Sequence, residues 1–98
     1  AQTKILHFVD NLHIIKDNMF DIPPLFKLIQ KEARVDWQEM YKVFNMGHRM
    51  ELYVSEEIAQ DIIAISESFN VKAKVVGRVE GFGGKKLTIN SEFGTYIY

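Results

Sequence analysis

An α+β fold, with a mostly antiparallel sheet and helices packed on one face, is predicted by three features of the sequence. Five short segments are apolar or alternate between apolar and polar residues, which is typical of strands. Three longer segments carry apolar residues at helical spacing, and turn-forming residues separate the elements. The 98 residues suffice for one modest core, so a single domain over residues 1–98 is expected.

The chain begins with two predicted strands. Residues Thr3 to Val9 are rich in apolar side chains with β propensity, and a second extended segment runs from Leu12 to Lys16. Asp10 and Asn11 between them favour a turn, because both side chains can bond to nearby backbone.

Two helices are predicted next. The pair Pro23-Pro24 lacks backbone donors and has a restricted φ, which suits the entrance of a helix from Pro24 to about Ala33. Asp36 is a good N-cap for a second helix that runs to about Val43, and Glu39 completes a capping-box pattern.

The second half of the chain alternates strands with one further helix. Asn45 and Gly47 end the preceding helix, because both tolerate the left-handed conformation found there. Alternating residues predict a half-buried strand over Met50–Val54. Ser55 is a good N-cap for the clearest amphipathic helix, whose apolar positions are Ile58, Ile62, Ile65 and Phe69.

The C-terminal part predicts a hairpin. A strand over residues 71–80 is followed by a turn from Gly81 to Gly84 and a strand from Lys86 to Asn90. The tail from Ser91 to Tyr98 is read either as an extended edge or as a frayed end. The expected order of elements is therefore β-β-α-α-β-α-β-β.

Composition excludes several classes of function. A net charge of −1 and scattered basic residues give no reason to expect a nucleic acid or an anionic membrane as partner. No apolar run approaches the roughly 20 residues that span a bilayer. The absence of cysteine excludes a disulfide framework and fits a cytoplasmic protein, and the three histidines have no ligand-like spacing, so no metal site is expected. The start at Ala1 lacks an initiator Met and a signal-peptide pattern, which we interpret as a cut inside a longer protein.

One block of residues carries a family resemblance. The stretch Ile22-Pro-Pro-Leu-Phe-Lys-Leu-Ile-Gln30, a spacer, and then Glu39-Met-Tyr-Lys-Val-Phe-Asn-Met-Gly47 resembles the C-terminal part of AIR synthetase, the cyclo-ligase of purine biosynthesis. The strand ending Val75-Val-Gly-Arg-Val79 is also similar to the family's last elements. The resemblance runs from about Thr3 to Ile89 and covers less than a third of such an enzyme.

The resemblance implies an activity for a longer parent protein. There, ATP phosphorylates the amide oxygen of formylglycinamidine ribonucleotide, an internal amine attacks, and the imidazole ring closes. ATP and Mg²⁺ are expected mainly on an N-terminal ATP-binding domain of the same chain, at the interface of a homodimer. The fragment itself has neither a phosphate-binding glycine loop before a helix nor an aspartate cluster, so we expect it to be inactive and to hold no cofactor of its own.

Five residues are candidates for a substrate or phosphate cleft, and no catalytic residue is assigned: Thr3, Asn45, Gly47, His48 and Arg49. The family usually has a second glycine where this chain has Arg49, and a guanidinium matches phosphate geometry. The competing interpretations are structural, namely a helix stop for the loop and an ordinary strand residue for Thr3. A stand-alone α+β ligand-binding or regulatory module is the alternative function.

Overall fold

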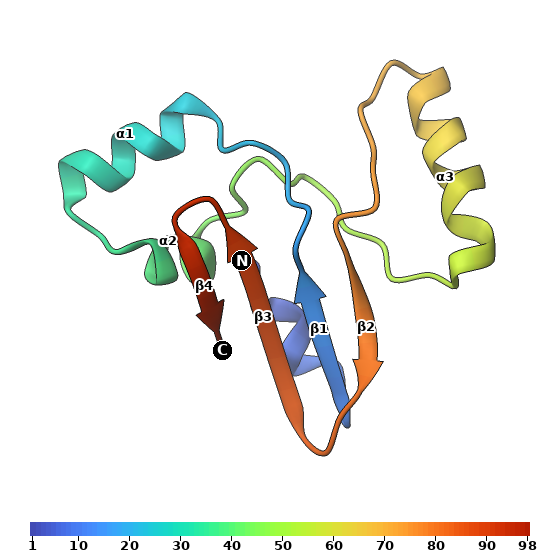
Figure 1. The fold of residues 1–98 in the computed structure, drawn as a ribbon. Helices are drawn as coiled ribbons and strands as arrows, with labels where there is room; N and C mark the ends of the chain where they lie inside the picture. The colour runs from blue at the N-terminus through green and yellow to red at the C-terminus, as the bar shows by residue number, and fades with distance from the viewer.

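A four-stranded mixed sheet is the centre of the computed structural model, which describes residues 1–98 (Figure 1). The strands lie in the order β2-β1-β3-β4. Strand β1 (Leu12–Lys16) pairs antiparallel with β2 (Gly77–Gly81) and parallel with β3 (Lys85–Ser91), and β4 (Gly94–Ile97) pairs antiparallel with β3. The α+β class is confirmed, and the expected antiparallel pairing holds for two of the three strand pairs.

The three predicted α-helices are all present. Helix α1 (Pro24–Ala33) begins with its proline, and α2 (Trp37–Val43) follows the predicted cap, where Asp36 Oδ1 accepts the Glu39 amide at 2.9 Å. Helix α3 (Glu56–Ser68) starts after Ser55, as expected, although the Ser55 side chain makes no capping bond. None of the helices is long and apolar enough to cross a membrane.

The first predicted strand is wrong. Residues Lys4–His7 form a 3₁₀ helix, η1, in which the amides of Leu6 and Phe8 bond to carbonyls three residues earlier. Helical spacing lets Ile5 and Leu6 pack against the core, whereas the sheet offers no partner to a strand here. The apolar run therefore indicates packing against the core, and a short helix provides this packing as well as a strand would.

Three further strand predictions need correction. Residues 50–54 form no ladder, and the apolar side chains expected to be half-buried, those of Met50, Leu52 and Val54, are exposed. Of the strand predicted over residues 71–80, only the part from Gly77 is paired, and the pairing ends at Gly81. The turn from Gly81 to Gly84 does not close a hairpin, because β1 lies between β2 and β3. The turn instead passes the start of β1, where the Phe82 amide donates to the Asn11 carbonyl at 3.0 Å. The C-terminal tail provides the edge strand β4.

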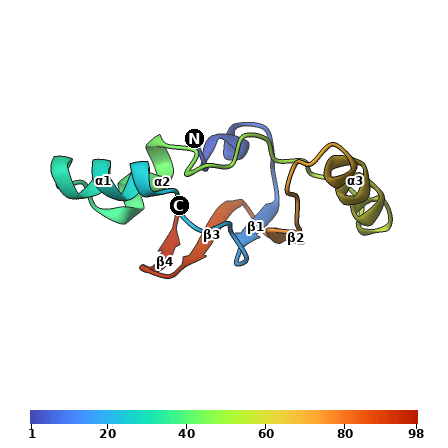
Figure 2. The ribbon, with the colours of Figure 1, turned by 90° about the horizontal axis from the view of Figure 1, so that it is seen from above.

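The core lies between one face of the sheet and the N-terminal elements. The fully buried side chains of the sheet belong to Ile14, Leu87 and Ile89, and they pack with residues of α2 and of the loops around it: Ile22, Met40, Tyr41 and Met46. Figure 2 shows η1, α1 and α2 on this side, while α3 stands apart from the sheet. Helix α3 has no buried residue, so the expectation that all helices cover one face is wrong for α3.

Gly77 allows β2 to approach β1, and its replacement by Ala is expected to destabilise the fold. A Cβ at this position would lie 1.9 Å from the Ile15 carbonyl oxygen, so the two strands would have to move apart. The expected loss in the free energy of unfolding is about 1–3 kcal/mol, measured by urea denaturation. Gly81→Ala is the matched control, because a Cβ there meets nothing within 4 Å. Equal stability of the two variants would contradict this account.

Candidate functional site

A buried lysine lies at the centre of the candidate site. Lys16 is the last residue of β1 and lies on the same side of the strand as the core residue Ile14, so its side chain is only 3% exposed. Its Nζ donates to the Gln2 carbonyl at 3.1 Å, to Gln2 Oε1 at 2.6 Å and to Glu51 Oε2 at 2.8 Å. Three acceptors around one nitrogen match the three donors of an ammonium group, so the geometry fits the charged form.

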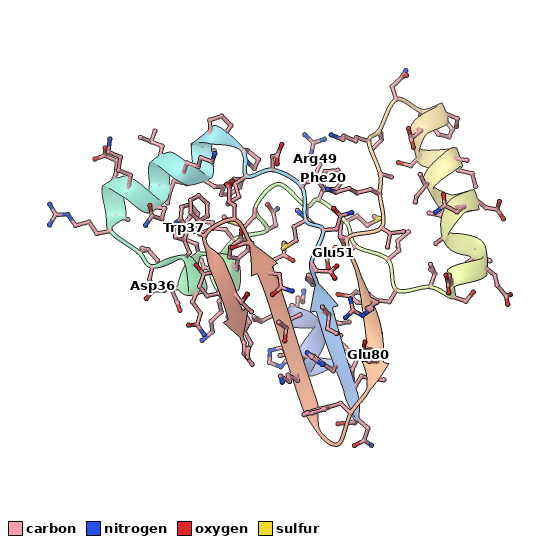
Figure 3. All side chains as sticks on the ribbon, in the orientation of Figure 1. Phe20, Asp36, Trp37, Arg49, Glu51 and Glu80 are labelled. Carbon is pink, nitrogen blue, oxygen red and sulfur yellow. The ribbon has the colours of Figure 1, made fainter.

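Glu51 connects this lysine to the loop that follows α2 (Figure 3). Its Oε2 also accepts the Tyr53 hydroxyl at 3.1 Å, and its Oε1 lies 3.2 Å from His48 Nδ1. The contact with His48 is within ion-pair distance, but it is not a well-directed hydrogen bond. The other ring nitrogen of His48 accepts the Phe20 amide at 3.3 Å, which leaves the proton on Nδ1, facing Glu51.

The electrostatics of this cluster favour an ionised Glu51. Burial alone would raise the pKa of Glu51, but the contact with His48, together with the hydrogen bond and charge of Lys16, outweighs it and lowers the pKa to about 2. The pKa of Lys16 is also lowered, because desolvation exceeds the gain from Glu51. Both groups are charged in the folded chain, because three acceptors surround the Lys16 ammonium group and Glu51, which is 20% exposed, also has His48 as a partner.

The loop from Asn45 to Gly47 forms a tight turn beside the cluster. Asn45 Oδ1 accepts the Gly47 amide at 2.8 Å, and the Asn45 carbonyl accepts Gln2 Nε2 at 2.7 Å. Gly47 has a φ of +88°, and a Cβ there would lie 2.7 Å from the Pro23 side chain. Gly47 therefore has a structural role, consistent with a helix stop, and it holds the loop against the start of α1.

A shallow depression of about 290 Å³ opens next to this cluster. Its lining includes three of the predicted residues, Asn45, His48 and Arg49, together with Lys4 and Glu51. Arg49 is exposed at its rim, and neither the Arg49 guanidinium nor Lys4 Nζ makes a hydrogen bond or ion pair within the chain. Two uncommitted cations beside an amide side chain can bind an anionic group such as a phosphate.

Thr3 does not join this depression. It precedes η1 and lines a separate, larger hollow of about 490 Å³ with Asp36, Lys42 and Tyr98. That hollow lies between η1, the start of α2 and the C-terminus, and it contains no arginine. The structure therefore brings Asn45, His48 and Arg49 together and leaves Thr3 outside.

Sequence reasoning missed the residues that organise the site. Lys16 alone carried a signal, because it stands two residues after Ile14 and therefore on the inward side of the strand. The alternation with Met50, Leu52 and Val54 directed Glu51 outward, whereas the structure exposes those apolar side chains and directs Glu51 toward Lys16. Gln2 carried no signal, since its role depends on the fold of the chain before η1.

Replacing Glu51 with Gln should lower the free energy of unfolding at pH 7 by about 3–5 kcal/mol, because Lys16 would keep a buried charge without a counterion. Since the folded-state pKa of Glu51 lies below its ordinary value of 4.5, the carboxylate stabilises the fold above pH 4.5. This stabilisation by the Glu51 carboxylate is lost as the pH falls toward 2. The Glu51→Gln variant should lack this pH-dependent part of its free energy of unfolding. Urea denaturation at pH 7 and pH 3, followed by Trp37 fluorescence, measures both effects.

Glu92→Gln is the control for this experiment. It breaks an exposed contact with Lys27 at 3.9 Å and should leave stability nearly unchanged. If both variants lost the same stability, the buried pair would not hold the site together.

Comparison with known proteins identifies the family of this chain. Residues 11–90 match the family described as AIR synthase related protein, C-terminal domain. The chain is 36% identical over 92 residues to a phosphoribosylformylglycinamidine cyclo-ligase from Syntrophus aciditrophicus, covering 85% of this chain and 26% of that protein. It is 42% identical over 77 residues to the protein of the same name from Methanococcus vannielii, covering 79% and 21%.

A third relative extends the comparison. The phosphoribosylformylglycinamidine cyclo-ligase from Methanopyrus kandleri is 41% identical over 71 residues, covering 72% of this chain and 20% of that protein. The chain therefore spans between a fifth and about a quarter of the length of these curated relatives. Since the match includes β1, the helices and most of β3, the chain belongs to the AIR synthase related protein family and corresponds to its C-terminal domain.

Proposed function

We propose that this chain is the C-terminal part of an ATP-dependent cyclo-ligase that converts formylglycinamidine ribonucleotide to aminoimidazole ribonucleotide. The family match over residues 11–90 and the names of the relatives support the proposal. The proposed partner is an N-terminal ATP-binding domain of the same parent protein, with residues 1–98 as one domain beside it. A homodimeric parent enzyme and a cytoplasmic location stay predictions of the same resemblance.

The role of this part would be to hold a phosphate of the substrate. The observation that carries this role is the placement of Arg49 and Lys4, two cations without an internal partner, on the depression beside Asn45. Arg49 can bind two phosphate oxygens through its planar guanidinium, and the Asn45 side chain is already oriented by its bond to the Gly47 amide. Thr3 would contribute only if the missing domain placed a substrate across both hollows.

The residues that line the depression do not fit Mg²⁺. The only carboxylate at the depression is Glu51, and its oxygens are directed at Lys16, Tyr53 and His48. Mg²⁺ prefers carboxylate oxygens that are free to coordinate it, so the metal and the ATP phosphates would be held outside this chain. His48 acts through Glu51 as a positioning residue, because its ring is buried and both of its nitrogens are engaged.

The proposed reaction depends mainly on positioning and on stabilisation of charge. ATP transfers its γ-phosphoryl group to the amide oxygen of the substrate, and the attacking amine must then reach the activated carbon as phosphate leaves. A fixed contact between Arg49 and a remote phosphate of the substrate would hold the reacting atoms in place through this sequence. The rigid base for that contact is the Lys16–Glu51 pair beneath the loop.

The isolated chain should show no cyclo-ligase turnover, because the sites for Mg²⁺ and for the reacting phosphates of ATP are proposed to lie on the N-terminal domain. Aminoimidazole ribonucleotide formation is measured with the purified chain, ATP, Mg²⁺ and formylglycinamidine ribonucleotide. Turnover at an enzyme-like rate would refute the assignment of ATP binding to another domain. Tight binding of a nucleotide or amino acid by the chain alone would instead favour a stand-alone binding module.

A chimeric enzyme tests the role of Arg49. The segment of the Methanococcus vannielii relative that aligns with this chain is replaced by it, and the chimera is assayed with and without Arg49→Ala. Loss of a charge-assisted phosphate contact of about 1.5–3 kcal/mol should lower kcat/KM roughly 10- to 100-fold. Lys31→Ala is the matched control, because Lys31 is an exposed cation on α1, away from the depression. An equal effect of both substitutions would argue against a phosphate contact at Arg49.

A further inference from the structure

Strand β2 has a free outer edge. It is the last strand of the sheet, pairs only with β1, and four of its five residues are exposed (Figure 1). The hydrogen bonds from the Phe82 amide to Asn11 and from the Asp17 amide to Val76 show which residues face β1. These two bonds continue the register of the β1–β2 ladder, in which every second residue of β2, namely Arg78 and Glu80, exchanges backbone hydrogen bonds with β1. The amides and carbonyls of Gly77, Val79 and Gly81 therefore point outward, away from β1.

The sequence of β2 is complementary to itself. It reads Gly77-Arg78-Val79-Glu80-Gly81, so glycines stand at both ends and opposite charges flank a central valine. If a second copy of β2 pairs antiparallel about an axis at Val79, Arg78 lies opposite Glu80 of the second copy, and Glu80 lies opposite its Arg78. These are the non-hydrogen-bonded positions of the new ladder, where facing side chains come closest.

The charges permit one register only. A shift of the second strand by two residues in either direction, the smallest that keeps the outward amides facing each other, places Arg78 or Glu80 directly opposite its own copy, and a parallel in-register arrangement faces like with like. Charged residues on an edge strand usually prevent such pairing. Here the charges of Arg78 and Glu80 disfavour the other registers and favour the pairing centred on Val79. In that pairing the Val79 side chain, 44% exposed, would meet its own copy at the axis.

We propose that two copies of this chain associate through the outer edges of β2, as an antiparallel pair centred on Val79. The pairing would join two four-stranded sheets into one and would align Arg78 and Glu80 of both copies in a network of alternating charge. Both side chains are about half exposed, at 56% and 51%, and within one chain Arg78 Nε donates to Glu80 Oε1 at 2.9 Å, so each can add a contact with the opposite charge of a second copy. This edge is the opposite edge of the sheet from β4, and it does not include the depression at Arg49: Figure 3 shows Glu80 well away from Arg49. The proposal does not depend on the proposed enzymatic function.

Sedimentation equilibrium of the whole chain over a concentration series up to the millimolar range tests the proposal, because so small an interface binds weakly. The chain should self-associate to a dimer. Arg78→Glu makes the edge wholly negative and Glu80→Arg makes it wholly positive, so each variant alone should remain monomeric. An equimolar mixture of the two should associate at least as well as the unchanged chain, and the double variant Arg78→Glu/Glu80→Arg should regain self-association.

Two controls separate pairing from stability. Asp17→Asn removes the contact between Asp17 and Arg78 at 2.8 Å within one chain and should leave association unchanged. Val79→Pro removes an outward amide that β1 does not use, so it should prevent association while thermal unfolding of the monomer changes little. A chain that stays monomeric at every concentration would overturn the proposal. Single variants that dimerise as well as the unchanged chain would overturn it too, since they would place the contact on another surface.

Discussion

A single buried ammonium group constrains the arrangement of the candidate site. Lys16 ends a strand whose inward row is otherwise apolar, so its charge must be compensated within the protein. The compensation comes from two distant parts of the chain, the backbone and side chain of Gln2 and the carboxylate of Glu51. The same contacts thereby attach η1 and the loop after α2 to the end of the central strand. The depression at Arg49 exists because these segments meet there.

The predictions from sequence succeeded where local chemistry decides the structure. The proline entrance of α1, the Asp36 cap of α2 and the spacing of Ile58, Ile62 and Ile65 in α3 each act within one or two turns. The strands failed more often, because a ladder requires a partner that a local pattern does not identify. The apolar run over residues 3–9 indicated packing against the core but not the 3₁₀ helix. The alternation over residues 50–54 predicted a half-buried strand, whereas the segment forms no ladder and exposes Met50, Leu52 and Val54. The turn at Gly81 to Gly84 was mistaken for a hairpin because β1, far away in sequence, lies between its strands.

The candidate site was predicted in part for the same reason. Asn45, His48 and Arg49 belong to one loop, so a family resemblance over that loop locates them together. Their supports come from positions far away in sequence, and only the fold reveals them. Thr3 was a candidate because of the family resemblance, and its position before η1 directs it to a different hollow. Gly47 and His48 maintain the shape of the loop, which leaves Arg49 as the residue free to meet a ligand.

The central claim is that Glu51 is an ionised partner of a buried lysine and of His48. The most direct measurement is the pH titration of the Glu51 carboxyl carbon by ¹³C NMR, in the intact chain. The account predicts a carboxylate signal that stays constant from neutral pH down to about pH 3, with a pKa near 2. A titration midpoint at the ordinary value near 4.5 would mean that the carboxylate has no such partners, and the proposed base of the site would be wrong.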